Sequence, residues 1–334
     1  MEVLAAPSVL PERRAKQSPV RDYLAKRGSG NGADKLFGGM MLAAALSILV
    51  IVCTILFVLV TNSRLSLHAF GLRFFIQDAW NPVLGDFGAL SFIFGTLVTS
   101  LLALCFAVPL ALCVSIFIQE ICPKPLQSPV AFLTELLAAI PSVVYGLWAV
   151  FVLVPIMRDQ AGPLLVRSLG WTGLFSGPNF GEGILTASII LSVMILPVIS
   201  SITREVMSAV PASQKEAVLA LGATRWEMIR IAILRNARVG IVGGVILGLG
   251  RALAETMAVT MVIGNNPQIS KSLFTPGYTL ASVLANEFAE ATGDLYVSAL
   301  IEIGLALFLV TVLVNTVARL LVWAVTRGNL AKAH

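Results

Sequence analysis

The sequence predicts an all-α integral membrane protein with six transmembrane helices. The chain is 57% hydrophobic and only 12% charged, and its mean hydropathy is +0.90, whereas about a quarter of the residues in an ordinary soluble domain are charged. A helical crossing needs roughly 20 apolar residues. Segments of that length occur at about 37–61, 91–118, 130–156, 183–207, 239–263 and 296–326. None shows the ten-residue alternation that is typical of a transmembrane β-barrel.

The distribution of Lys and Arg predicts that both ends of the chain are cytoplasmic. With the N-terminus inside, the cytoplasmic stretches hold seventeen basic residues and the outer stretches hold five, while Arg251 lies within the fifth segment. This asymmetry follows the positive-inside rule. Because the basic residues flank helices as topology signals do, we expect no nucleic-acid partner.

The polar residues at the two ends delimit the domains. Residues 1–35 lack the apolar core of a signal peptide, which predicts a mostly disordered cytoplasmic tail. Residues 36–326 form the transmembrane domain, with a cytoplasmic loop at 204–238, and residues 327–334 form a second cytoplasmic tail. The cysteines and histidines have no metal-ligand spacing, so we expect neither a metal site nor a histidine-based catalytic centre.

The fifth segment carries a charge pair, Arg251 and Glu255. A charge at the bilayer centre costs about 2.5–3.5 kcal/mol on insertion scales, so such residues usually face a bundle interior or a water-filled path. Gly240, Gly244 and Gly248 form a stripe of small residues that permits close helix packing. In a continuous helix both charges lie within about 60° of Gly248, which predicts that they share the packed face.

Three interpretations of this charge pair remain open. Arg251 and Glu255 could neutralise each other as a structural ion pair. Arg251 could contact a passing anion while Glu255 sets its rotamer, because guanidinium offers a planar donor fork suited to phosphate or carboxylate oxygens. Glu255 could also serve as a proton relay.

Other polar residues lie within or beside the apolar segments. Glu135 and Ser142 are seven residues apart in the third segment, so in one helix they share a face, with Tyr145 near it. Pro141 is expected to kink this helix and to free backbone carbonyls. Glu302 in the sixth segment is expected near the outer interface.

The cytoplasmic loop from Thr203 to Arg238 has the pattern of an amphipathic helix–turn–helix. Pro211 ends one element, and a breaker-free stretch then runs to Gly222, where a positive φ can end a helix. Apolar residues recur at helical spacing, which favours docking against a partner over a solvated connector. They are Ala217, Leu221, Trp226, Ile229 and Ile233.

The stretch Glu216-Ala217-Val218, followed by Gly222, resembles the EAA motif of ABC-importer permeases. In that family a short coupling helix docks into a groove on the ATPase subunit. The resemblance implies that Glu216, Ala217, Gly222 and Trp226 contribute to coupling. Two positions depart from the pattern: Val218 replaces alanine, and Arg235 replaces the proline of the usual Leu-Pro ending.

Longer motifs resemble one subfamily, the PstC-type permease of the phosphate-specific ABC importer. They are Phe94–Ser100, Glu135–Gly146, Gly248–Val259 and Ala285–Glu290, and the likeness covers about residues 35–325. It implies the type I ABC-importer (MetI-like) permease fold in the bacterial cytoplasmic (inner) membrane. The substrate-path residues on this chain would then be Arg251, Glu255, Glu135, Ser142 and Tyr145.

The same resemblance implies the partners. A second permease, two ATPase subunits and an extracytoplasmic phosphate-binding protein would complete the importer. The sequence has no G-x-x-x-x-G-K-[ST] phosphate loop, so we expect no cofactor on this chain, no enzymatic activity, and ATP and Mg²⁺ on the partner subunits. The alternatives are a gradient-driven anion transporter or channel and a structural membrane scaffold.

Overall fold

The computed structural model describes residues 30–330, with side chains from Asp34 to Trp323. Most of the predicted N-terminal tail, residues 1–35, lies outside this range, and its last part, from Gly30 to Lys35, is helical. The chain divides into two units, one ending at Val58 and the other beginning at Leu59. The two units are described separately.

The first unit consists of most of helix α2 (Gly30–Asn62). Its side chains are almost all apolar from Leu36 to Val58, on every side of the helix. A helix that is apolar all round is suited to lipid or to a membrane-embedded partner. This helix confirms the first predicted crossing.

The second unit begins with a compact outer segment. The end of α2 is followed by α3 (Arg64–Phe70) and the single turn η1 (Gly71–Phe75). An antiparallel hairpin of β1 (Trp80–Asn81) and β2 (Asp86–Phe87) comes next, with Trp80 opposite Phe87.

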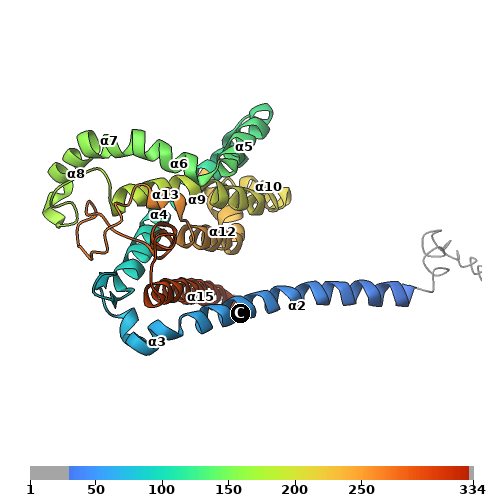
Figure 1. Cartoon of the computed structure of the whole chain (residues 1–334). Coiled ribbons are helices and arrows are strands. Elements are labelled where there is room, and N and C mark those ends of the chain that lie inside the picture. Colours follow the sequence, from blue (N-terminus) through green and yellow to red (C-terminus); the bar gives the residue numbers. More distant parts are fainter. Residues whose placement is uncertain (1–29, 331–334) are drawn as a thin grey trace, which may run out of the picture. The chain divides into compact units, whose positions relative to one another are not determined.

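Helices α4 (Leu90–Ile116) and α9 (Ile184–Ser208) pack side by side at the centre of the second unit (Figure 1). Small residues of α4 face large aliphatic residues of α9, which allows close approach. The buried residues at this contact include Ala103, Ala107, Ala111, Ile190, Leu191, Ile195 and Ile199. Both helices confirm predicted crossings.

The third predicted segment is not one kinked helix. Helix α5 (Lys124–Ala139) ends before Pro141, and α6 (Ser142–Trp148) begins after it. Ile140 between them is extended, at φ −68° and ψ 129°, because a residue that precedes proline disfavours the α region. The crossing therefore shifts to Ser142–Thr172. After α6 it comprises η3 (Ala149–Leu153), α7 (Val154–Ile156), η4 (Met157–Ala161), α8 (Gly162–Leu169) and η5 (Gly170–Thr172).

The fifth predicted segment is also interrupted. Helix α12 (Arg235–Leu253) ends, residues 254–256 are not helical, and α13 (Met257–Thr260) is a single turn. The Thr256 hydroxyl donates to the Ala254 carbonyl at 3.3 Å, and local bonds of this kind compete with the helical pattern. The crossing runs from Arg225 to Leu253 instead.

The final elements are α14 (Leu280–Glu287) and the long α15 (Asp294–Leu330), which contains the sixth crossing. A second core joins them to the outer segment. Its buried residues include Phe74, Phe87, Phe92, Tyr278, Leu300 and Ile303.

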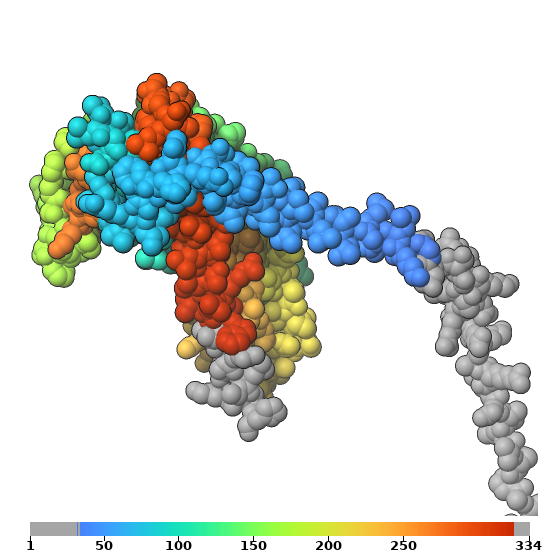
Figure 2. Space-filling view, turned by 60° about the horizontal axis from the view of Figure 1, so that its bottom comes forward, coloured from blue at the N-terminus to red at the C-terminus, as the bar shows by residue number. Residues whose placement is uncertain are grey.

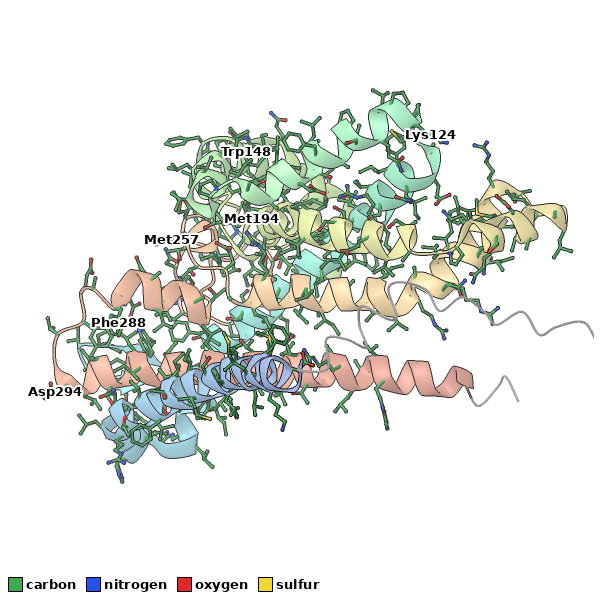
Figure 3. The ribbon with its side chains drawn as sticks, turned by 90° about the vertical axis from the view of Figure 1, so that its right-hand side faces the viewer. Lys124, Trp148, Met194, Met257, Phe288 and Asp294 are labelled. Atoms are coloured by element: carbon green, nitrogen blue, oxygen red, sulfur yellow. The ribbon has the colours of Figure 1, made fainter. Side chains whose placement is uncertain are left out.

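The cytoplasmic loop and the C-terminal part of α15 lie at the same end of the second unit. The loop contains α10 (Ala212–Ala220), α11 (Arg225–Met228) and η6 (Ile229–Leu234). Figure 2 shows its yellow atoms exposed beside the red end of α15. Phe288 and Asp294 lie at the opposite end (Figure 3), which agrees with the predicted orientation.

Candidate functional site

Arg251 lies in the last turn of α12, and its side chain is exposed. It lines an open groove of about 1070 Å³ between α9, α12 and α15. Within residues 30–330, the ion pairs that form involve other residues, so the guanidinium has no carboxylate partner in this part of the chain. The facing side of α15 contributes polar residues to the same groove: Thr311, Asn315, Thr316 and Arg319.

The glycine stripe of α12 packs against α9, as predicted. A Cβ atom added at Gly240 would lie 2.5 Å from a Val206 methyl carbon, and one added at Gly248 would lie 2.7 Å from Ile199 Cγ1. Arg251, however, borders the groove instead of the packed face, so the expectation that both charges lie on that face is wrong. Arg251 lies in the same helix as Gly248, and its offset of about 60° around the helix axis turns it from the glycine stripe towards the groove. Glu255 leaves the packed face because it lies beyond the end of that helix.

Glu255 lies beyond the end of α12 and is half-buried. Its backbone N–H donates to the Ala252 carbonyl at 3.4 Å. Since residues 254–256 leave the helix, Arg251 and Glu255 are not helical i,i+4 neighbours, and no ion pair within 4.0 Å joins them in the described structure. The self-neutralising pair considered from the sequence does not form in this chain.

Helix α6 places Tyr145 beside this helix break. Gly146 packs against α13, since an added Cβ would lie 2.5 Å from Met261 Sδ and 3.2 Å from Ala258 Cα. Figure 3 shows Trp148, at the end of α6, in the same region as Met257, at the start of α13. The buried Tyr145 hydroxyl donates to the Leu137 carbonyl at 2.7 Å across the Pro141 break.

Ser142 and Glu135 are separated by that break. Ser142 begins α6 and is half-buried, so it stays in the region of Tyr145. Glu135 lies on α5 and forms an ion pair with Arg204 of α9. The pair borders a small pocket of about 320 Å³ that Ser142 and Arg251 do not line. The expectation that Glu135 and Ser142 share a helix face is therefore wrong.

The cytoplasmic loop has the predicted helix–turn–helix form. Gly222 adopts φ +86° after α10, which confirms its predicted role as the turn residue. The next helix begins with a capping box in which the Thr224 hydroxyl accepts from the Glu227 N–H at 3.3 Å. The Glu227 carboxylate in turn accepts from the Thr224 N–H at 2.8 Å. The T-x-x-E spacing could have revealed this cap in the sequence.

The apolar residues of the loop divide into two groups. Leu221 is 89% exposed and Trp226 is 60% exposed, and Ala217 is exposed as well. Ile229 and Ile233 are instead buried in a core with Met207 and Met228. Only the first group is available to a partner, so the predicted single apolar face is wrong for Ile229 and Ile233.

A charged contact that the sequence did not reveal anchors the loop. Lys215 Nζ lies 2.6 Å from Glu120 Oε1 in η2 (Phe117–Ile121), the turn that follows α4. Glu216, the predicted motif residue, is exposed and forms no ion pair within the described chain. Lys215 and Glu120 are far apart in sequence, so no spacing signal connects them.

Glu287 lies in the Ala285–Glu290 motif on the outer face, and two aromatic side chains hold its carboxylate by hydrogen bonds. Its carboxylate accepts from Trp80 Nε1 at 2.8 Å and from the Tyr296 hydroxyl at 2.7 Å. Asn286 donates to the neighbouring Tyr278 hydroxyl at 2.8 Å. Burial raises the pKa of Tyr278 above its ordinary value, so this phenol stays protonated. These bonds connect the outer hairpin to α14 and α15.

Residues 111–328 match the model of the family described as "Binding-protein-dependent transport system inner membrane component". The match covers more than half of the chain. The chain belongs to this family.

Permeases with similar sequences support a narrower assignment. The phosphate transport system permease protein PstC of Mesorhizobium japonicum is 46% identical over 86% of this chain and 89% of its own length. The PstC protein of Haemophilus influenzae is 44% identical over 86% of this chain and 93% of its own. These relatives confirm the predicted PstC-type subfamily of multi-pass inner membrane permeases. The permease is thus a transport subunit and works with other subunits of an ABC transporter.

Solved structures confirm the fold of the permease. A chain of the MetNI methionine ABC transporter superposes with a TM-score of 0.52 at 17% identity, covering 70% of this chain and 94% of that chain. A chain of a bacterial ABC transporter involved in the import of the acidic polysaccharide alginate superposes with a TM-score of 0.55 at 17% identity. The superposition covers 86% of this chain and 96% of that chain. The type I importer permease fold predicted from the sequence is therefore correct.

Proposed function

We propose that this chain is the permease subunit of an ATP-driven inorganic phosphate importer and that Arg251 contacts the passing anion. The observation that carries this proposal is the exposed Arg251 guanidinium, which has no carboxylate partner among the described residues and lies beside the break that ends the fifth crossing. A permanently charged side chain at this depth needs a counter-charge or water. An anion in transit supplies that counter-charge. The names of the relatives, phosphate transport system permease proteins, support phosphate as the anion.

The helix break adds a second feature suited to a transport path. Irregular backbone at membrane depth is tolerated where it is buried in protein or lines a water-filled cavity, and transporters often place such breaks at the substrate. Residues 254–256 leave the helix after Leu253, two residues beyond Arg251. Glu255 lies within this break and can accept a hydrogen bond from a protonated phosphate oxygen. Ser142 and Tyr145 on α6 border the same region, whereas Glu135 is better suited to the cytoplasmic ion pair with Arg204.

The energy for transport comes from partner subunits. The exposed Ala217, Leu221 and Trp226 of the cytoplasmic loop, together with Glu216 and the Gly222 turn, form the docking surface for an ATPase subunit. ATP and Mg²⁺ bind to the ATPase subunits and not to this chain. A second permease completes the path opposite Arg251, two ATPase subunits drive it, and a phosphate-binding protein delivers the substrate to the outer loops.

The test is reconstitution of the permease with candidate partners in lipid vesicles. Phosphate-loaded binding protein should stimulate ATP hydrolysis by the complex and drive phosphate uptake, and omission of the ATPase should abolish uptake. Phosphate uptake by this chain alone, driven by an ion gradient without ATP, would instead establish the gradient-driven transporter and overturn the proposal.

A further inference from the structure

Helix α15 contains a carboxyl group that the proposed transport path does not use. Glu302 is 0% exposed, and neither carboxyl oxygen has a hydrogen-bond partner among the described residues. The sequence suggested a position at the outer interface, where a charge costs little. The structure places Glu302 inside the protein, where α15 packs against α3 (Figure 1).

Two buried serine residues, one on α15 and one on α3, lie near Glu302. The Ser298 hydroxyl, one turn earlier on α15, donates to the Asn62 carbonyl at 3.0 Å and accepts from the Ser66 N–H at 3.2 Å. Ser298 is therefore already engaged. Ser66 on α3 lies near Glu302, because its backbone N–H binds Ser298 one turn earlier on α15. The Ser66 hydroxyl is fully buried and has no hydrogen-bond partner in the described chain. Two buried polar groups from two helices thus lie together without partners.

No cation faces this carboxyl from the described parts of the elements packed around it. On α3, Arg64 and His68 are exposed. Helix α4 carries no charged residue, and the charged Glu287 of α14 is bound by Trp80 and by Tyr296 of α15. The other charged residues described on α15 are Asp294, at its start, and Arg319, which lines the groove beside Arg251.

Protonation of the Glu302 carboxyl removes the cost of burying a charge without a partner. An ionised carboxylate that is buried without a partner is strongly destabilising, and such a group normally takes up a proton instead. A protonated carboxyl offers one O–H donor, and a serine hydroxyl accepts. One hydrogen bond from Glu302 to Ser66 Oγ therefore satisfies both groups.

We propose that Glu302 is a proton-binding site in the outer half of the permease, and that its neutral carboxyl donates to Ser66 and fastens α3 to α15. Stability from this contact is complete while the carboxyl is protonated and is lost as the pH rises. Because α3 leads into the outer hairpin, deprotonation loosens the outer segment of the permease.

Infrared spectroscopy of the assembled complex in lipid nanodiscs tests the protonation state directly. Wild-type protein at neutral pH should show the C=O stretch of a protonated carboxyl, and Glu302→Gln should lose it. Ser66→Ala should keep the band but move it to higher frequency, because the hydrogen bond is gone. Glu290→Gln, which replaces an exposed carboxylate of the outer face, is the control and should leave the band unchanged. The proposal would be overturned if the Glu302→Gln spectrum differed from the wild-type spectrum only by the loss of carboxylate bands.

Thermal unfolding of the same complexes gives an independent result. Glu302→Gln, a neutral isostere, should keep the wild-type midpoint within about 2 °C at neutral pH and should lose the decline of the wild type at alkaline pH. Glu302→Ala should lower the midpoint at every pH. A wild type that gains stability with rising pH, or one that is stabilised by Na⁺ only while Glu302 is present, would show an ionised carboxylate and contradict the proposal.

Discussion

Lys215 of the cytoplasmic loop and Glu120 at the end of the α4 crossing form an ion pair with 2.6 Å between Nζ and Oε1. Their side chains are only 21% and 10% exposed. The pair connects α10, which carries Glu216 and Ala217 of the proposed docking surface, to a helix of the central core. We infer that it transmits movement of the docked loop to the transmembrane helices.

Replacing Lys215 with Met should therefore impair coupling as well as stability. The substitution leaves the mostly buried Glu120 carboxylate without its cation. We expect this to lower the free energy of unfolding by on the order of 1–3 kcal/mol, which lies between the values for exposed and fully buried ion pairs. Thermal unfolding and phosphate-stimulated ATP hydrolysis by the reconstituted complex measure the two effects. Lys124→Met, at an exposed lysine without an ion pair in residues 30–330, is the control. Full activity in Lys215→Met would show that the pair plays no part in coupling.

The glycine stripe of α12 gives a matched pair of stability variants. Gly248→Ala introduces a methyl group 2.7 Å from Ile199 Cγ1, and we expect a loss of about 1–3 kcal/mol from overpacking. Gly243→Ala on the same helix meets no atom within 4 Å and should be neutral or stabilising by up to about 1 kcal/mol, since alanine favours helix. Thermal unfolding in detergent compares them. Equal effects would contradict the close packing of α12 on α9.

The exposed Trp226 should contribute to binding the ATPase subunit and little to folding. Trp226→Ala should leave the unfolding midpoint near that of the wild type but weaken ATPase association roughly tenfold or more, as for a central aromatic interface residue. Ile233→Ala, in the buried core beneath, should instead destabilise the fold by about 2–5 kcal/mol. Co-purification and titration with the ATPase measure the first effect. Undiminished ATPase affinity in Trp226→Ala would exclude this surface as the docking site.

The Tyr145 hydroxyl should stabilise the junction between α5 and α6. Tyr145→Phe removes the donor to the Leu137 carbonyl, which should cost about 0.5–1.5 kcal/mol. Hydrogen exchange of the α5–α6 junction should increase in the variant, while exchange in α9 should not. Unchanged protection at the junction would show that another group satisfies this carbonyl.

The sequence predicted the features that depend on local pattern. Apolar length predicted the six crossings, and small-residue spacing predicted the packing of α12 on α9. Glycine at position 222 predicted the turn with positive φ. Each of these signals lies within one segment, where residue type alone limits the backbone.

The features that the sequence missed depend on contacts between distant segments. Residues 254–256 contain neither proline nor glycine, so the break after α12 has no composition signal. Glu302 lies in an apolar stretch that suits an interface position equally well, and its burial depends on the packing of helices distant in sequence, among them α3. At Pro141 the sequence predicted a kink within one helix, whereas the extended Ile140 ends the helix there.

Radiolabelled phosphate uptake by reconstituted wild-type and Arg251→Gln complexes tests whether Arg251 contacts the passing anion. Arg251→Gln should assemble with its partners and keep the wild-type unfolding midpoint, but should lose roughly 10–100-fold in uptake because a charge-assisted contact is removed. Arg73→Gln, at an exposed outer arginine, should transport normally. Undiminished phosphate uptake by an assembled Arg251→Gln complex would show that Arg251 does not contact the anion.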